Sequence, residues 1–104
     1  MFIPLPALAI GSVLTVSTTD RVPSLDTRPA CADAAQSISV TRTVEICERS
    51  EQQARDSLVG QWRTFPSADR ASCTAETRIG GFPSYVQVLT CLELARDARS
   101  MKPD

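Results

Sequence analysis

The four cysteines are the residues of this chain with the clearest chemical options. Cys31, Cys47, Cys73 and Cys91 are widely spaced, and no two of them form a C-x-x-C pair. Structural zinc sites and thioredoxin-like redox sites depend on closely spaced cysteine pairs, so this spacing argues against both. Four widely spaced cysteines in a short chain instead predict two structural disulfides, which form in an oxidising compartment. Free buried thiols and an unrecognised metal site are the alternatives.

Other catalytic groups are scarce. The chain has no histidine, which excludes Ser-His-Asp and Cys-His catalysis and histidine-ligated metals. Ser67 and Ser84 therefore lack a histidine base, and the one lysine, Lys102, lies in the C-terminal tail. We expect a protein that is not an enzyme, with no catalytic residue, cofactor or metal site. A carboxylate pair for hydrolysis is not expected, because helical spacing places most acidic residues on solvent-facing sides: Glu45, Glu48, Glu51, Asp69, Glu76, Glu93 and Asp97.

Two connections between predicted helices carry the remaining candidates for binding. The Gly80-Gly81 turn before Ser84 could bind an anion at a helix N-terminus, but it lacks the further glycines and the lysine of a phosphate loop, so a capping turn is expected. Trp62 and Phe65 are expected inside, because so small a core needs them. Phe82, at a loop tip, and Tyr85 are the candidate contacts with a partner protein.

Length and charge limit the class of protein. The chain has 104 residues, enough for one small core, and a formal net charge of −1 at pH 7. This balance argues against binding to nucleic acids or anionic membranes.

The N-terminus is typical of an exported protein. Residues 2–16 are uncharged and mostly apolar, too short for a membrane-spanning helix but suited to the core of a signal peptide. Small residues at 17–19 suit cleavage between about Ser17 and Asp20. No basic residue precedes the apolar run, so a disordered N-terminus created by a misplaced start codon is the alternative. The predicted organisation is a signal peptide (1–19), a flexible linker (20–29), a helical domain (30–99) and a C-terminal tail (100–104).

The predicted domain is all-α, a small three- to four-helix array held by two disulfides. The longest helix carries apolar residues at steps of three, four or seven, namely Val44, Cys47, Ala54, Leu58, Trp62 and Phe65. Pro66 ends it, and Ser67 is the predicted N-cap of the next helix. Ser84 and Gln87 predict a capping box at the start of the last helix. The predicted helices are 30–36, 41–64, 68–77 and 85–99.

The predicted helices also constrain the disulfide pairing. At 1.5 Å per residue, Cys47 lies roughly 25 Å from the turn at Pro66, whereas Cys73 lies only about 9 Å beyond it. These two cysteines therefore cannot meet in a simple antiparallel hairpin. We favour Cys31–Cys47 with Cys73–Cys91. If the last helix instead runs parallel to the long one, Cys31–Cys73 with Cys47–Cys91 is the alternative.

Several stretches of the domain resemble small exported cysteine-containing proteins of unknown function from rhizobia and related alphaproteobacteria. The resemblance covers roughly residues 31–99, and its most specific part is the G-G-x-P-S-Y-V…L-T-C-L-E segment. That family implies no activity, cofactor or catalytic residue. The other matching stretches are T-V-E-I-C (Thr43–Cys47), A-R-D-S-L-V (Ala54–Val59), Q-W-R-T-F (Gln61–Phe65) and A-D-R-A-S-C (Ala68–Cys73).

Together these features predict a non-enzymatic binding or envelope-associated module, exported to the periplasm or the cell exterior. Its expected partner is an unknown protein or envelope component, with no nucleic acid and no stable membrane span in the mature form. A small thiol-redox or carboxylate-dependent hydrolytic enzyme is the alternative.

Overall fold

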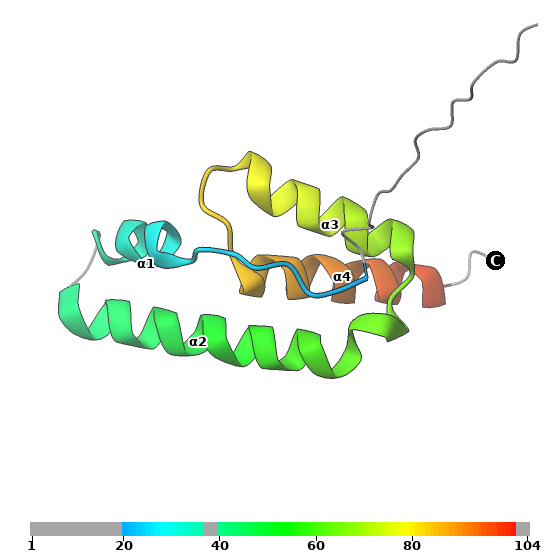
Figure 1. Ribbon diagram of the computed structural model, residues 1–104, viewed down its shortest axis with the longest axis horizontal. Helices are drawn as coiled ribbons and strands as arrows, with labels where there is room; N and C mark the ends of the chain where they lie inside the picture. The colour runs from blue at the N-terminus through cyan, green and yellow to red at the C-terminus, as the bar shows by residue number, and fades with distance from the viewer. Residues whose placement is uncertain (1–19, 37–39, 102–104) are drawn as a thin grey trace, which may run out of the picture.

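The computed structural model describes residues 20–36 and 40–101, which form helices joined by short connections (Figure 1). No strand occurs among these residues, so the predicted all-α class is confirmed. The predicted signal peptide, its cleavage site and most of the connection between the first two predicted helices lie outside the described residues. The elements are α1 (Arg28–Ala35), α2 (Val40–Gln61), the 3-10 helix η2 (Trp62–Thr64), α3 (Ser67–Ile79) and α4 (Tyr85–Ser100).

The long helix α2 ends in a tightened turn. Gln61 leaves the helical region at φ −133° and ψ 13°, and residues 62–64 continue as the 3-10 helix η2. Phe65 is extended, at φ −89° and ψ 143°. Pro66 explains this, because a residue before proline is disfavoured in the helical region. The predicted stop at Pro66 is therefore confirmed, and the last turn of the predicted helix is 3-10.

The start of α3 differs from its prediction. Pro66 is the N-cap, at φ −60° and ψ 145°, and its carbonyl accepts the first helical bond from the Arg70 N–H at 3.0 Å. Ser67 is already helical and is not the cap, because the extended proline lets the helix begin one residue earlier than expected. At the other end, α3 runs past Thr77 to Ile79, and Gly81 has a φ of 89°, in the left-handed region that favours glycine.

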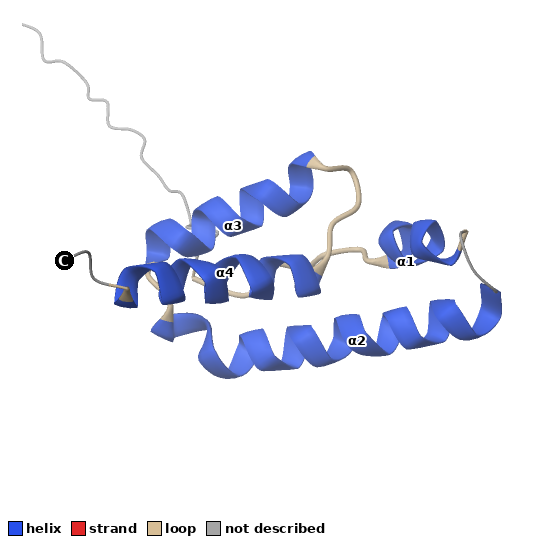
Figure 2. Ribbon diagram, turned by 180° about the vertical axis from the view of Figure 1, so that it is seen from behind, coloured by secondary structure: helices blue, strands red, loops and turns tan. Residues whose placement is uncertain are grey.

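Two chain reversals place α4 between α2 and α3 (Figures 1 and 2). As a result α4 runs antiparallel to α3 and in the same direction as α2, while α1 packs on the first half of α2. The main core lies where α2, η2, α3 and α4 meet, and it includes Trp62 and Phe65, as predicted. Its buried members are Ala54, Leu58, Trp62, Phe65, Cys73, Tyr85, Val88 and Leu92.

Both favoured disulfides are confirmed. Cys31–Cys47 joins α1 to α2 with the Cα atoms 5.5 Å apart, and Cys73–Cys91 joins α3 to α4 with the Cα atoms 5.7 Å apart. The alternative pairing was tied to a last helix parallel to the long one, and α4 does run that way. Each cysteine nevertheless pairs with one on the helix packed directly against its own.

The structure differs from the prediction that residues 20–29 form a flexible linker. Arg28 and Pro29 already belong to α1, and residues 20–27 form an extended segment across α2 and α4, called here the N-terminal strap (Figure 1). Val22 and Leu25 pack against the main core. The Tyr85 hydroxyl accepts from the Leu25 N–H at 2.8 Å and donates to the Pro23 carbonyl at 2.9 Å. The strap is thus held by apolar packing and by one side chain of α4.

Replacing Tyr85 by phenylalanine tests this attachment. We expect Tyr85→Phe to lower the free energy of unfolding by about 1–2 kcal/mol, because it removes two hydrogen bonds while keeping the ring. Amide hydrogen exchange should show faster exchange at Leu25, with protection in α3 unchanged. Unaltered exchange at Leu25 would contradict the attachment of the strap by the Tyr85 hydroxyl.

Candidate functional site: a buried carboxylate and an arginine-lined groove

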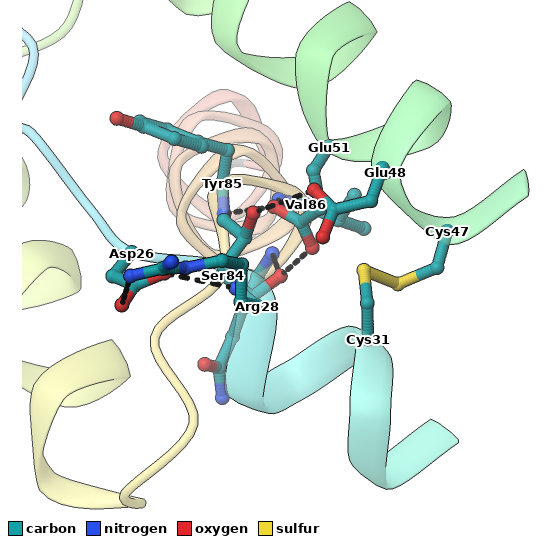
Figure 3. Close-up of a disulfide and its surroundings, with 11 residues drawn as sticks. Asp26, Arg28, Cys31, Cys47, Glu48, Glu51, Ser84, Tyr85 and Val86 are labelled. Atoms are coloured by element: carbon teal, nitrogen blue, oxygen red, sulfur yellow. Dashed lines mark hydrogen bonds and ion pairs between the residues drawn. A yellow bond between two sulfur atoms is a disulfide. The ribbon is translucent and has the colours of Figure 1, made fainter. Parts of the chain in front are cut away.

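A buried carboxylate from α2 closes the N-terminus of α4 (Figure 3). Glu51 is only 5% exposed. Its Oε2 accepts from the Ser84 hydroxyl at 2.5 Å, and its Oε1 accepts from the Tyr85 N–H at 2.6 Å and more weakly from the Val86 N–H at 3.4 Å. A negative charge at a helix N-terminus is favoured by the helix dipole, and the bonds offset the cost of burying it.

A second polar cluster completes this helix start. The Ser84 hydroxyl accepts from the Gln87 N–H at 3.2 Å, which confirms one half of the predicted capping box. The other half is wrong. The Ser84 N–H donates to the Thr77 hydroxyl at 2.9 Å, and that hydroxyl donates to Gln87 Oε1 at 2.6 Å. Because Thr77 of α3 is fully buried beside Ser84, it takes the bond that the Gln87 side chain was expected to make.

These contacts bear on two of the candidate sites, the anion site before Ser84 and the acidic residues. The N-terminus of α4, considered above as an anion site, already holds the Glu51 carboxylate. Glu51 was grouped with acidic residues of which most were expected on solvent-facing sides, and the structure buries it. The sequence did contain a signal for this, since position 51 lies between Cys47 and Ala54 in the apolar stripe of the long helix. Both oxygens of Glu51 accept hydrogen bonds from the start of α4, so this carboxylate has a structural role.

The two candidate partner contacts differ in exposure. Phe82 is 48% exposed on the α3–α4 connection, as a contact residue would need to be. Tyr85 is 6% exposed, and its hydroxyl is bonded to the strap, so it is not available to a partner. Tyr85 follows a loop in the sequence, but the strap that covers it lies about 60 positions earlier, so local sequence does not indicate its burial.

The structure contains a groove that no local sequence pattern indicates. It has a volume of about 470 Å³, is open to solvent, and lies between the start of the strap and the end of α2. Val22, Val59 and Trp62 contribute its apolar side. The complete lining is Asp20, Arg21, Val22, Arg55, Val59, Gly60, Gln61, Trp62, Arg63 and Thr64. A smaller cavity of about 210 Å³ follows along the strap, and Arg55 lines both.

The groove carries an excess of positive charge. Its lining includes three arginines, Arg21, Arg55 and Arg63, but only one carboxylate, that of Asp20. The ion pairs found in the described residues use other arginines, namely Arg28, Arg96 and Arg99. The carbonyl end of α2 adds a partial negative charge, which is smaller than the charge of the three guanidinium groups. The groove is therefore suited to an anionic group with an apolar neighbour.

Two ion pairs elsewhere, Asp26–Arg28 and Asp69–Arg99, predict a loss of stability in acid. Hydrogen bonds from the Arg28 side chain and backbone lower the pKa of Asp26 to about 2, and the Arg99 guanidinium lowers the pKa of Asp69. Because these carboxyls hold protons less strongly in the folded chain, their stabilising effect is present above the unfolded-state pKa of 3.8 and is lost as the pH falls through the lowered pKa values, about 2 for Asp26. Urea unfolding between pH 6 and pH 2 should show a shallower acid loss in Asp26→Asn/Asp69→Asn. An unchanged pH dependence would contradict this assignment.

Searches for similar proteins give no family for the chain. Neither a family model, nor a curated protein, nor a solved structure matches it.

Within residues 20–36 and 40–101, no three acidic or cysteine side chains converge as a metal ion would require. In the same ranges, no helix has the length and apolar character needed to cross a bilayer.

Proposed function

We propose that this chain is an exported, non-enzymatic binding module whose ligand occupies the arginine-lined groove. The observation that carries the proposal is the set of three guanidinium groups, from Arg21, Arg55 and Arg63, around an open hollow with an apolar side. A binding site needs such a concave surface with a few polar groups that orient the ligand. The resemblance to small exported proteins of alphaproteobacteria agrees with export; because those proteins have no known activity, it does not bear on binding.

The alternative enzymatic functions have less support. All four cysteines are paired, and Cys31 and Cys73 are buried, so a thiol-redox reaction would first require opening a structural disulfide. A carboxylate-dependent hydrolase would need a free acidic pair, whereas Glu51, the buried glutamate, caps α4.

Export is supported by the two disulfides, which persist in oxidising compartments. We expect mass spectrometry of the native protein to find an N-terminus between about Ser17 and Asp20, since small residues follow the apolar run there. An intact Met1 in a cytosolic fraction would contradict export.

Site-specific crosslinking in the producing cell tests the groove. A photoreactive amino acid placed at Val59, which is 55% exposed in the groove, should form adducts with the ligand. The matched control is Leu94, which is 64% exposed on α4 and does not line the groove. Adducts from Val59 alone support the proposal. Equal adducts from both positions, or none from Val59, would contradict it.

A further inference from the structure

Gly60 has no evident structural reason to be glycine. It lies in the last turn of α2, where glycine destabilises a helix relative to alanine. Its φ is not in the left-handed region, and a Cβ added to it would meet no atom within 4 Å. Neither backbone conformation nor close packing against the described residues therefore requires glycine here. Its effect is to leave the groove hollow between Val59 and Gln61.

The charges of the groove indicate the ligand's polar groups. A guanidinium group binds a carboxylate through two parallel N–H···O bonds, a geometry that lysine cannot offer. Arg55 and Arg63 come from successive parts of α2 and η2, and Arg21 comes from the strap on the other side. A ligand in the hollow would therefore meet guanidinium groups from both walls. Between them, Val22 and Val59 offer an aliphatic surface.

The shape and the overall charge narrow the ligand class. Sites for small molecules usually enclose most of the ligand, whereas this groove is open to solvent and suits a segment of extended chain. A long polyanion such as a nucleic acid would also meet the twelve acidic residues of a chain with net charge −1. A short acidic segment would meet only the local positive charge.

We propose that the groove binds an acidic peptide segment of a partner protein, in which carboxylate side chains flank an aliphatic residue. The aliphatic side chain packs over Gly60 against Val22 and Val59, and the carboxylates pair with Arg55 and Arg63 on one wall and Arg21 on the other. This inference rests on the proposed function and specifies its ligand.

Binding of defined peptides tests the proposal. The probes are acetyl-EELEEL-amide, its uncharged analogue QQLQQL and its polar analogue EESEES. Trp62 is the single tryptophan of the chain and lines the groove, so its fluorescence reports binding there. We expect EELEEL to bind at least about tenfold more tightly than either analogue, and its affinity to fall as salt is raised.

Matched variants locate the site. Arg55→Gln/Arg63→Gln should weaken EELEEL binding about tenfold or more, whereas Arg49→Gln/Arg78→Gln makes the same charge change outside the groove and should retain it. Gly60→Leu should block binding by filling the hollow, and Gly60→Ala should weaken it less. Circular dichroism and Tm confirm folding of each variant, and the open space around Gly60 makes both glycine variants compatible with the fold.

The outcomes separate this inference from the proposed function. Equal binding of EELEEL and QQLQQL, or equal losses in the two double variants, would overturn carboxylate recognition in the groove. Binding of decanoate but of no peptide would assign the groove to a small amphiphile and also overturn the inference. If no peptide binds while Val59 still forms adducts in cells, the acidic-peptide assignment fails and the binding module stands.

Discussion

Glu51→Ala is expected to lower the free energy of unfolding by about 3 kcal/mol, measured by urea denaturation and circular dichroism. The substitution leaves the Ser84 hydroxyl and the backbone N–H groups of Tyr85 and Val86 without their acceptor at a buried helix start. It also removes the negative charge that the dipole of α4 favours there. The start of α4 holds both the core side chain of Tyr85 and the strap, so the loss should extend beyond one helix turn.

Two variants control this prediction. Glu45→Ala removes an exposed glutamate from the same helix and should change stability by less than about 0.5 kcal/mol. Glu51→Gln keeps one acceptor oxygen without the charge and should fall between the two, which preserves the test if Glu51→Ala does not fold. If Glu51→Ala is as stable as Glu45→Ala, the carboxylate does not hold α4.

Removal of the disulfide between α3 and α4 is expected to have an effect of similar size. On the chain-entropy model, a bridge that closes a loop of this length stabilises the folded chain by about 3 kcal/mol. For a domain of this size that corresponds to a fall in Tm of about 10–20 °C. Cys73→Ala/Cys91→Ala should show this loss, because Cys73 belongs to the main core and Cys91 packs against it.

The other disulfide provides the comparison. Cys31 is buried with Ala35 outside the main core, and α1 packs on α2. Cys31→Ala/Cys47→Ala should therefore release α1, seen as faster amide exchange over Arg28–Ala35, with a smaller fall in Tm. A larger Tm loss from this pair than from Cys73→Ala/Cys91→Ala would contradict the assignment of the core. An unchanged Tm of the wild-type protein in excess reductant, with all thiols shown to be free, would instead contradict the stabilising role of the disulfides.

The helices could be predicted because their signals are local. The apolar period of α2, the stop at Pro66, the turn at Gly81 and the Ser84 cap each depend on residues within a few positions of one another. The disulfide pairing was also accessible, since the cysteines of each bridge lie on consecutive elements, 16 and 18 positions apart. These are properties that the sequence determined by itself.

The strap, the buried carboxylate and the groove depend on contacts between distant parts of the chain. Tyr85 bonds to Leu25 across 60 positions, and Glu51 reaches Tyr85 across 34. Local composition made residues 20–29 look like a linker, because the apolar surface that Val22 and Leu25 cover forms only when α2 and α4 pack together. Likewise, Arg21 and Arg55 line one groove only after the strap is in place. Tertiary structure decided these features, because each joins partners that no local sequence pattern connects.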